Sequence, residues 1–148
     1  PLKRDQRFLL IEQIATERNN AIQHPAKMFK DAVRYNPHLA FCEIAFSADE
    51  EDLGRMNALI PDYDTIVITN FQDRASATHT EFLEEQIAKH PDKTFIIVIN
   101  KPFAFTIPKN AKNVLCTFSK APQSLNAAVR ILFGELEPQG TLPIETVP

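Results

Sequence analysis

Five short apolar segments recur along the chain at intervals of about 30 residues, the repeat of a strand–helix–strand unit. They cover residues 7–11, 39–46, 65–69, 94–99 and 113–118, are rich in Ile, Val and Phe, and are nearly continuous rather than alternating. Short continuous apolar runs are typical of strands that are covered on both faces of a parallel sheet. We therefore expect these segments to form the central strands of one sheet.

Helical patterns with recognisable starts lie between most of these segments. Pro25 precedes a short apolar face and favours a helix that ends before Asn36-Pro37, because a residue before proline disfavours the helical region. Two capping boxes are expected at later helix starts, one formed by Ser47 with Glu50 and the other by Thr78 with Glu81.

The last helical pattern is the clearest of them. Apolar residues at 125, 128, 129 and 132 have the spacing of one helix face, and Gly134 stands where a left-handed residue usually ends a helix. Strand and helix thus alternate, which predicts an α/β fold: an open, mostly parallel, doubly wound sheet of about five or six strands, flavodoxin-like or Rossmann-like, with helices on both faces.

Two stretches depart from this alternation. Residues 100–112 contain Pro102 and Pro108 and are barely long enough for a helical crossover, so we expect an irregular loop or a short reversed strand there. Residues 1–135 are expected to form a single α/β domain, and residues 136–148, with three prolines and a glycine, an extended and docked C-terminal tail.

Composition narrows the possible functions. The chain has 148 residues, 44% of them hydrophobic, and a net charge of −3, which fits one ordinary globular domain and gives no basic excess for nucleic acid. No run is long and apolar enough for a membrane span or a signal peptide, and the sequence leaves localisation open. Cys42 and Cys116 are expected to be buried free thiols, and the four histidines show no metal-ligand spacing.

The usual cofactor signatures are missing from the sequence. Three glycines cannot form a dinucleotide-binding fingerprint or a Walker loop, and there is no G-x-S-x-G nucleophile elbow. We therefore expect no cofactor, no metal site and no catalytic residue.

Polar candidates instead follow the expected third and fourth strands, where open α/β sheets bind ligands. Asn70, Asp73 and Arg74 provide donors, acceptors and both charges near an aromatic ring, a combination that suits sugar recognition, and Lys101 is a second candidate. The alternative is that Asp73 and Arg74 only cap the next helix and solvate the loop, and that Lys101 is a plain exposed lysine.

Three segments resemble family 3 glycoside hydrolases, in the order in which that family has them. Residues 132–144, Leu-Phe-Gly-Glu-Leu-Glu-Pro-Gln-Gly-Thr-Leu-Pro-Ile, resemble the segment that closes the C-terminal domain of that family. Asp64-Thr-Ile-Val-Ile-Thr-Asn70 is similar to one of its strands, and Val114-Leu-Cys-Thr-Phe118 followed by Ala127-Ala128 is similar to another segment.

The resemblance implies a non-catalytic C-terminal domain of a larger hydrolase. In the family an N-terminal (β/α)8 barrel carries the nucleophile, and the β-glucosidase branch takes its acid/base Glu from the C-terminal domain. The corresponding loop here, residues 70–77, contains no Glu, which favours the retaining β-N-acetylglucosaminidase branch, whose acid/base lies on the barrel. The implied partners are that barrel and, through the parent enzyme, a sugar containing N-acetylglucosamine, with the tail docked on this domain or on the barrel.

Two alternatives remain open at this point. One is a β-glucosidase-like parent of the same family, and the other is a free-standing α/β module that binds a small ligand. If the parent is a family 3 enzyme of either branch, we expect the isolated chain to be inactive and the parent to be a glycoside hydrolase.

Overall fold

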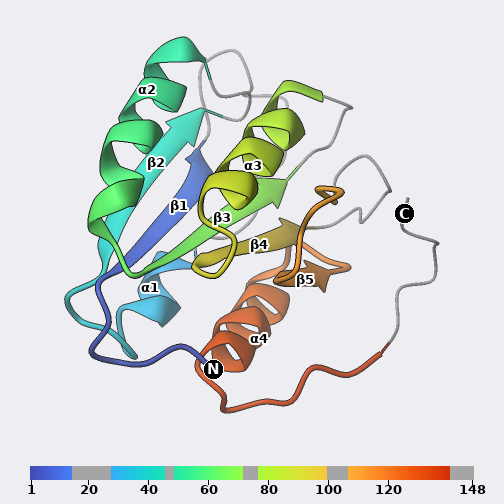
Figure 1. Cartoon of the computed structure of the whole chain (residues 1–148). Coiled ribbons are helices and arrows are strands. Elements are labelled where there is room, and N and C mark those ends of the chain that lie inside the picture. Colours follow the sequence, from blue (N-terminus) through green and yellow to red (C-terminus); the bar gives the residue numbers. More distant parts are fainter. Residues whose placement is uncertain (15–27, 46–48, 72–76, 100–106, 141–148) are drawn as a thin grey trace.

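The computed structural model describes residues 1–14, 28–45, 49–71, 77–99 and 107–140, and shows one sheet with helices on both faces (Figure 1). The strands are β1 (Phe8–Ile14), β2 (Ala40–Ala45), β3 (Thr65–Phe71), β4 (Thr94–Ile99) and β5 (Val114–Thr117). The helices are α1 (Phe29–Ala32), α2 (Glu50–Leu59), α3 (Ala77–Lys89) and α4 (Pro122–Leu132), with a 3-10 turn η2 (Ile60–Asp62) after α2. All five predicted strands are confirmed, with small differences at their ends.

The strands pair in the order β2-β1-β3-β4-β5, and every pairing among them is parallel. This is the flavodoxin-like order of a doubly wound sheet. In the register, Ile68 at the centre of β3 lies beside Ile11 of β1 and Ile96 of β4. The predicted fold class is therefore confirmed.

Two apolar cores lie on opposite faces of the sheet, because successive strand residues point to opposite sides. The first is covered by α2 and α3, which contribute Met56, Leu83 and Ile87. The second is covered by α1 and α4, which contribute Ala32 and Val129. All seven residues of β3 are buried, as expected for a strand with a neighbour on each side and a helical layer on each face.

The two predicted capping boxes are wrong in position. The helix α2 begins at Glu50 and its N-cap is Asp49, whose side chain accepts the N–H of Asp52 while the Asp52 side chain accepts the N–H of Asp49. The helix α3 begins at Ala77, so Thr78 lies inside its first turn rather than at its cap. Ser, Thr and Asp all serve as caps, and the surrounding packing decides which of several nearby candidates is used.

The prediction for the last helix is confirmed. Gly134 has a φ of +80° directly after α4, a backbone conformation that glycine adopts without strain. A Cβ at this position would lie 2.8 Å from the Cβ of Pro1, and the N–H of Leu2 donates to the carbonyl of Leu132. The start of the chain is thus packed against the end of α4 (Figure 1).

The connection from β4 to β5 differs from the other crossovers. Its described part, residues 107–113, contains no helix or strand, and residues 100–106 lie outside the described residues. The predicted irregular loop is confirmed for the described part, whereas the suggested reversed strand is not tested. In the part of the chain that the structure describes, no helix is long and apolar enough to cross a membrane.

Candidate functional site

The carboxyl ends of the parallel strands meet at one edge of the sheet, which we call the carboxyl edge. In a doubly wound fold this edge is where ligands bind, because loops from neighbouring strands converge there. Described residues at this edge include Glu12 on β1, Asn70 and Phe71 on β3, and the segment 117–121 after β5.

Glu12 is a buried carboxylate near the end of β1, only 3% exposed. Its Oε1 accepts the N–H of Met28 at 2.7 Å, and its Oε2 accepts the N–H of Phe29 at 3.3 Å. Free N–H groups at a helix start favour a negative charge, so Glu12 fixes the beginning of α1 beneath the carboxyl edge. No local pattern in the sequence indicates this role, because Glu12 and Met28 are 16 residues apart.

Asn70 and Phe71 form the end of β3, and both side chains are fully buried. The ammonium group of Lys120 lies 6.0 Å from the centre of the Phe71 ring, within the range of a cation–π contact. This contact joins the end of the central strand β3 to the loop after β5, across the intervening β4. It places one positive charge at the carboxyl edge.

The segment after β5 is held by its own side chains. The hydroxyl of Thr117 donates to the carbonyl of Ser119 at 3.0 Å, and the Ser119 hydroxyl accepts the N–H of Ala121, also at 3.0 Å. These bonds form a tight turn that leads into Pro122 at the start of α4. The side chain of Phe118 in this turn is 59% exposed.

The structure tests only part of the predicted site. Asn70 is at the predicted place on the carboxyl edge, but it belongs to β3 itself and is fully buried. Asp73 and Arg74 follow β3, and Lys101 follows β4, and all three lie outside the described residues. Their role in binding therefore stays a prediction.

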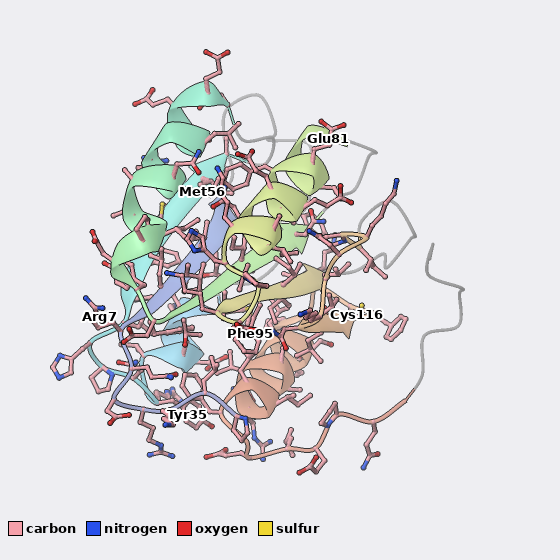
Figure 2. The ribbon with its side chains drawn as sticks, viewed as in Figure 1. Arg7, Tyr35, Met56, Glu81, Phe95 and Cys116 are labelled. Carbon is pink, nitrogen blue, oxygen red and sulfur yellow. The ribbon has the colours of Figure 1, made fainter. Side chains whose placement is uncertain are left out.

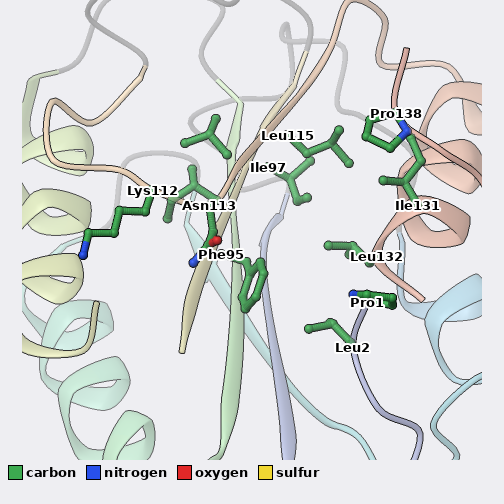
Figure 3. Close-up of a pocket in the computed structure, with 12 residues that line it drawn as sticks. Pro1, Leu2, Phe95, Ile97, Lys112, Asn113, Leu115, Ile131, Leu132 and Pro138 are labelled. Carbon is green, nitrogen blue, oxygen red and sulfur yellow. The ribbon is translucent and has the colours of Figure 1, made fainter. Parts of the chain in front are cut away.

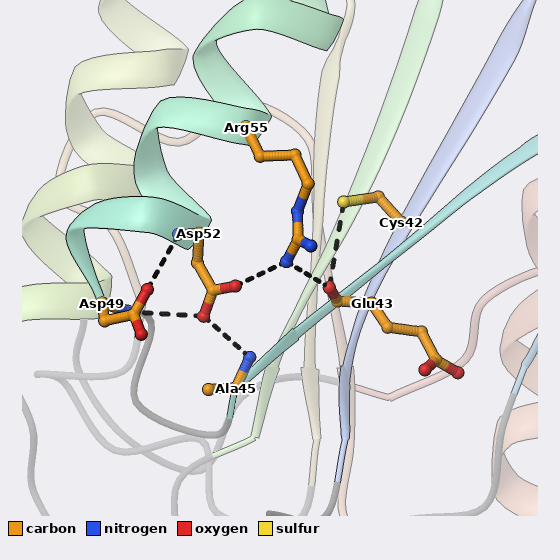
Figure 4. Close-up of polar contacts among 6 residues, drawn as sticks. All are labelled: Cys42, Glu43, Ala45, Asp49, Asp52 and Arg55. Carbon is orange, nitrogen blue, oxygen red and sulfur yellow. Dashed lines mark hydrogen bonds and ion pairs between the residues drawn. The ribbon is translucent and has the colours of Figure 1, made fainter.

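A second polar cluster closes the outer edge of β2 (Figure 4). Asp52 of α2 accepts the N–H of Ala45 at 3.0 Å, and Arg55 donates to the carbonyl of Glu43 at 2.8 Å and pairs with Asp52. The two side chains thus bond to backbone groups of β2, which is an edge strand of the described sheet. This arrangement explains why the charged side chain of Asp52 is buried.

The two cysteines do not form a site together. Cys42 is on β2 and Cys116 is on β5, at opposite edges of the sheet and four strand spacings apart, roughly 19 Å since neighbouring strands lie about 4.8 Å apart. Both thiols are free; Cys42 is buried as predicted, but Cys116 is only half-buried. Figure 2 shows Cys116 on β5, at the edge of the sheet away from α2, which carries Met56; both residues belong to the apolar cluster on one face of the sheet.

Neither thiol is activated for nucleophilic chemistry. Burial raises the pKa of Cys116, and burial also raises the pKa of Cys42 against the opposing effect of the Arg55 charge. Both are therefore protonated at neutral pH, and a protonated thiol is a poor nucleophile. Among the described residues, no three His, Cys, Asp or Glu side chains are grouped so that they could hold a metal ion.

The comparisons with known proteins concern the fold. No family model and no curated protein matches the sequence. The structure is similar to a glycoside hydrolase family 3 β-N-acetylglucosaminidase from Paenibacillus sp. str. FPU-7, with a TM-score of 0.80 and 16% identity, over 96% of this chain and 28% of that chain.

A second similar structure is a fungal multi-domain family 3 β-N-acetylglucosaminidase that has a GCN5-related glucosamine N-acetyltransferase region. Here the TM-score is 0.69 and the identity 16%, over 99% of this chain and 16% of that chain. The chain thus spans less than a third of the length of either similar protein. At this identity the matches show an open α/β fold shared with part of two larger enzymes.

Proposed function

We propose that this chain is a non-catalytic domain of a retaining family 3 β-N-acetylglucosaminidase, the C-terminal domain by the resemblance of residues 132–144. In that parent it packs on an N-terminal (β/α)8 barrel, which carries the catalytic carboxyl groups, and its carboxyl edge borders the sugar-binding cleft. The observation that carries the proposal is the match of 96% of this chain to 28% of a β-N-acetylglucosaminidase chain, at a TM-score of 0.80.

The chemistry of the carboxyl edge supports a binding role rather than a catalytic one. In the sequence, Asp73 and Arg74 come shortly after β3, and Lys101 comes shortly after β4, the strand that pairs with β3. Ends of adjacent parallel strands lie together, so we expect these three charged residues, which are outside the described part of the chain, to come near one another. Hydroxyl-rich sugars bind to such mixed hydrogen-bond donors and acceptors. Asn70 lies near the end of β3, the strand that precedes Asp73 and Arg74.

Hydrolysis of a chromogenic N-acetyl-β-glucosaminide tests the proposal. We expect turnover by the parent and none by this chain alone. In the parent, Asp73→Ala and Arg74→Ala should each raise KM about 10-fold, since a hydrogen bond from a charged group contributes on the order of 1.5–3 kcal/mol.

Asp92→Ala and Arg34→Ala are matched controls, because both residues are exposed and precede strands, at the opposite end of the sheet. They should leave KM unchanged. Turnover by the isolated chain would overturn the proposal, and a parent that prefers a chromogenic β-glucoside would favour the β-glucosidase-like alternative.

A further inference from the structure

An apolar pocket opens beside the edge strand β5 (Figure 3). Its volume is about 320 Å³, and β4, β5, the end of α4 and both described ends of the chain contribute to its lining. The main apolar side chains are those of Pro1, Leu2, Phe95, Leu115, Leu132 and Pro138. It lies on the face of the sheet that α4 covers, where the helix leaves part of β5 uncovered.

The strand β5 itself is incompletely covered. Val114, Leu115 and Cys116 are all half-buried, in contrast to the fully buried β3. Among the described residues, β5 pairs with β4 alone, and none of their side chains makes a hydrogen bond to its outer backbone groups. A row of free backbone groups along an edge strand is a ready surface for association.

Phe118 extends this surface at the carboxyl end of β5. Among the residues that the structure describes, it is the large hydrophobic side chain that stays exposed, at 59%. The pocket, β5 and Phe118 form one continuous strip along the edge of the sheet, which we call the β5 strip.

We propose that the β5 strip is the surface on which the barrel of the parent enzyme packs; this rests on the function proposed above. The connection of the chain supports this occupant over a separate protein. In a parent whose barrel precedes residue 1, the chain enters this domain through Pro1, which lines the pocket and is packed against Gly134 at the end of α4. The barrel is thus tethered at one end of the strip.

The strip also lies within reach of the carboxyl edge. Neighbouring strands are about 4.8 Å apart, so the ends of β4 and β3 lie about 5 and 10 Å from the end of β5. A barrel packed on β5 and Phe118 would therefore lie close to the carboxyl ends of β4 and β3, where the site proposed above is expected. Packing on the opposite edge would face α2 and its contacts to β2 instead.

Hydroxyl-radical footprinting of Phe118 tests the proposal with the isolated chain and the intact parent. We expect modification of Phe118 to be about fivefold lower in the parent, as for a side chain that enters an interface core. Tyr63, which is half-buried just before the start of β3 and therefore at the opposite end of the sheet, is the internal reference and should be modified equally in both proteins. Equal modification of Phe118 in the two proteins would overturn the inference.

A pair of substitutions gives a second readout. Phe118→Asp in the parent should separate the thermal unfolding of the two domains into two transitions, because a charge would enter the apolar interface. Ala58→Asp introduces the same charge at an exposed position of α2, at the other edge of the sheet, and should leave one transition. One transition in both variants would contradict the inference.

The outcomes separate this inference from the proposed function. A parent that hydrolyses the N-acetylglucosaminide while Phe118 stays reactive keeps the function and rejects the β5 strip as the interface. A parent without this activity in which Phe118 is protected rejects the function and keeps the interface. Protection of Phe118 in the isolated chain that rises with concentration would indicate a second copy on the strip, and would reject the barrel.

Discussion

The two edge strands of the sheet are closed in different ways. Outer backbone groups of β2 bond to Asp52 and Arg55 of α2, so this edge is completed by the chain itself. The outer side of β5 has no such bond from a described residue, and its side chains are half-buried. An uncovered edge strand invites pairing or association, so one edge of this domain is sealed and the other is left for a partner.

The largest effect on stability is expected from truncating an apolar side chain in each edge strand, because β2 is more deeply buried there than β5. Ile44→Ala in β2 should lower the free energy of unfolding by about 3 kcal/mol, because a fully buried Ile loses its contacts and leaves a cavity. Leu115→Ala in β5 should lower it by about 1 kcal/mol, since less area is removed from the core. Urea denaturation of both variants measures the difference, and equal losses would contradict the comparison.

A smaller effect is expected from the contacts that seal β2. Asp52→Ala removes one half of the capping box and the acceptor for the N–H of Ala45, and should cost about 1.5 kcal/mol in the free energy of unfolding. Glu51→Ala, an exposed position in the same helical turn, is the control and should cost about 0.5 kcal/mol or less. If the two variants unfold at the same urea concentration, α2 does not seal this edge.

The reaction rates of the two thiols measure how accessible each edge of the sheet is to a reagent. At about pH 8, Cys116 on the open edge should react with a thiol reagent about 10-fold faster than Cys42, which is buried beneath α2. Single Cys→Ser variants assign each rate, and urea should make the two rates equal. A faster Cys42 would reverse the assignment of open and sealed edges.

The raised pKa values of the two thiols also predict how the stability of the fold changes with pH. Burial raises the folded-state pKa of both thiols above the value in the unfolded chain. Their contribution to stability is therefore complete below the unfolded pKa and is lost as the pH rises through the folded pKa. The urea midpoint should fall in that alkaline range, and by less in the double Cys→Ser variant.

Part of the candidate site could be predicted from the sequence, and part could not. The position of Asn70 at the end of a central strand follows from the apolar run before it, but its complete burial depends on the neighbours of β3. The contact of Lys120 with Phe71 joins residues that are far apart in sequence, so no local pattern indicates it. Asp73, Arg74 and Lys101 remain predictions from sequence alone.

By itself the sequence determined the five strands, the last helix and its end at Gly134. These features depend on local properties: apolar runs, the spacing of one helix face, and a glycine that tolerates a positive φ. The caps of α2 show the limit of such signals, because Ser47 and Asp49 are both acceptable caps and only packing against β2 selects Asp49.

Only the tertiary structure decided which strands are neighbours and which edges are open. Parallel strands pair through the same backbone groups whatever their order in the sheet. An apolar run therefore predicts that a strand is buried but does not predict which strand lies beside it. The order that puts β2 and β5 at the two edges, and the placing of α2 against β2 alone, emerge from packing both cores at once. That packing leaves most of β5 only half-buried, because no described helix crosses over between β4 and β5.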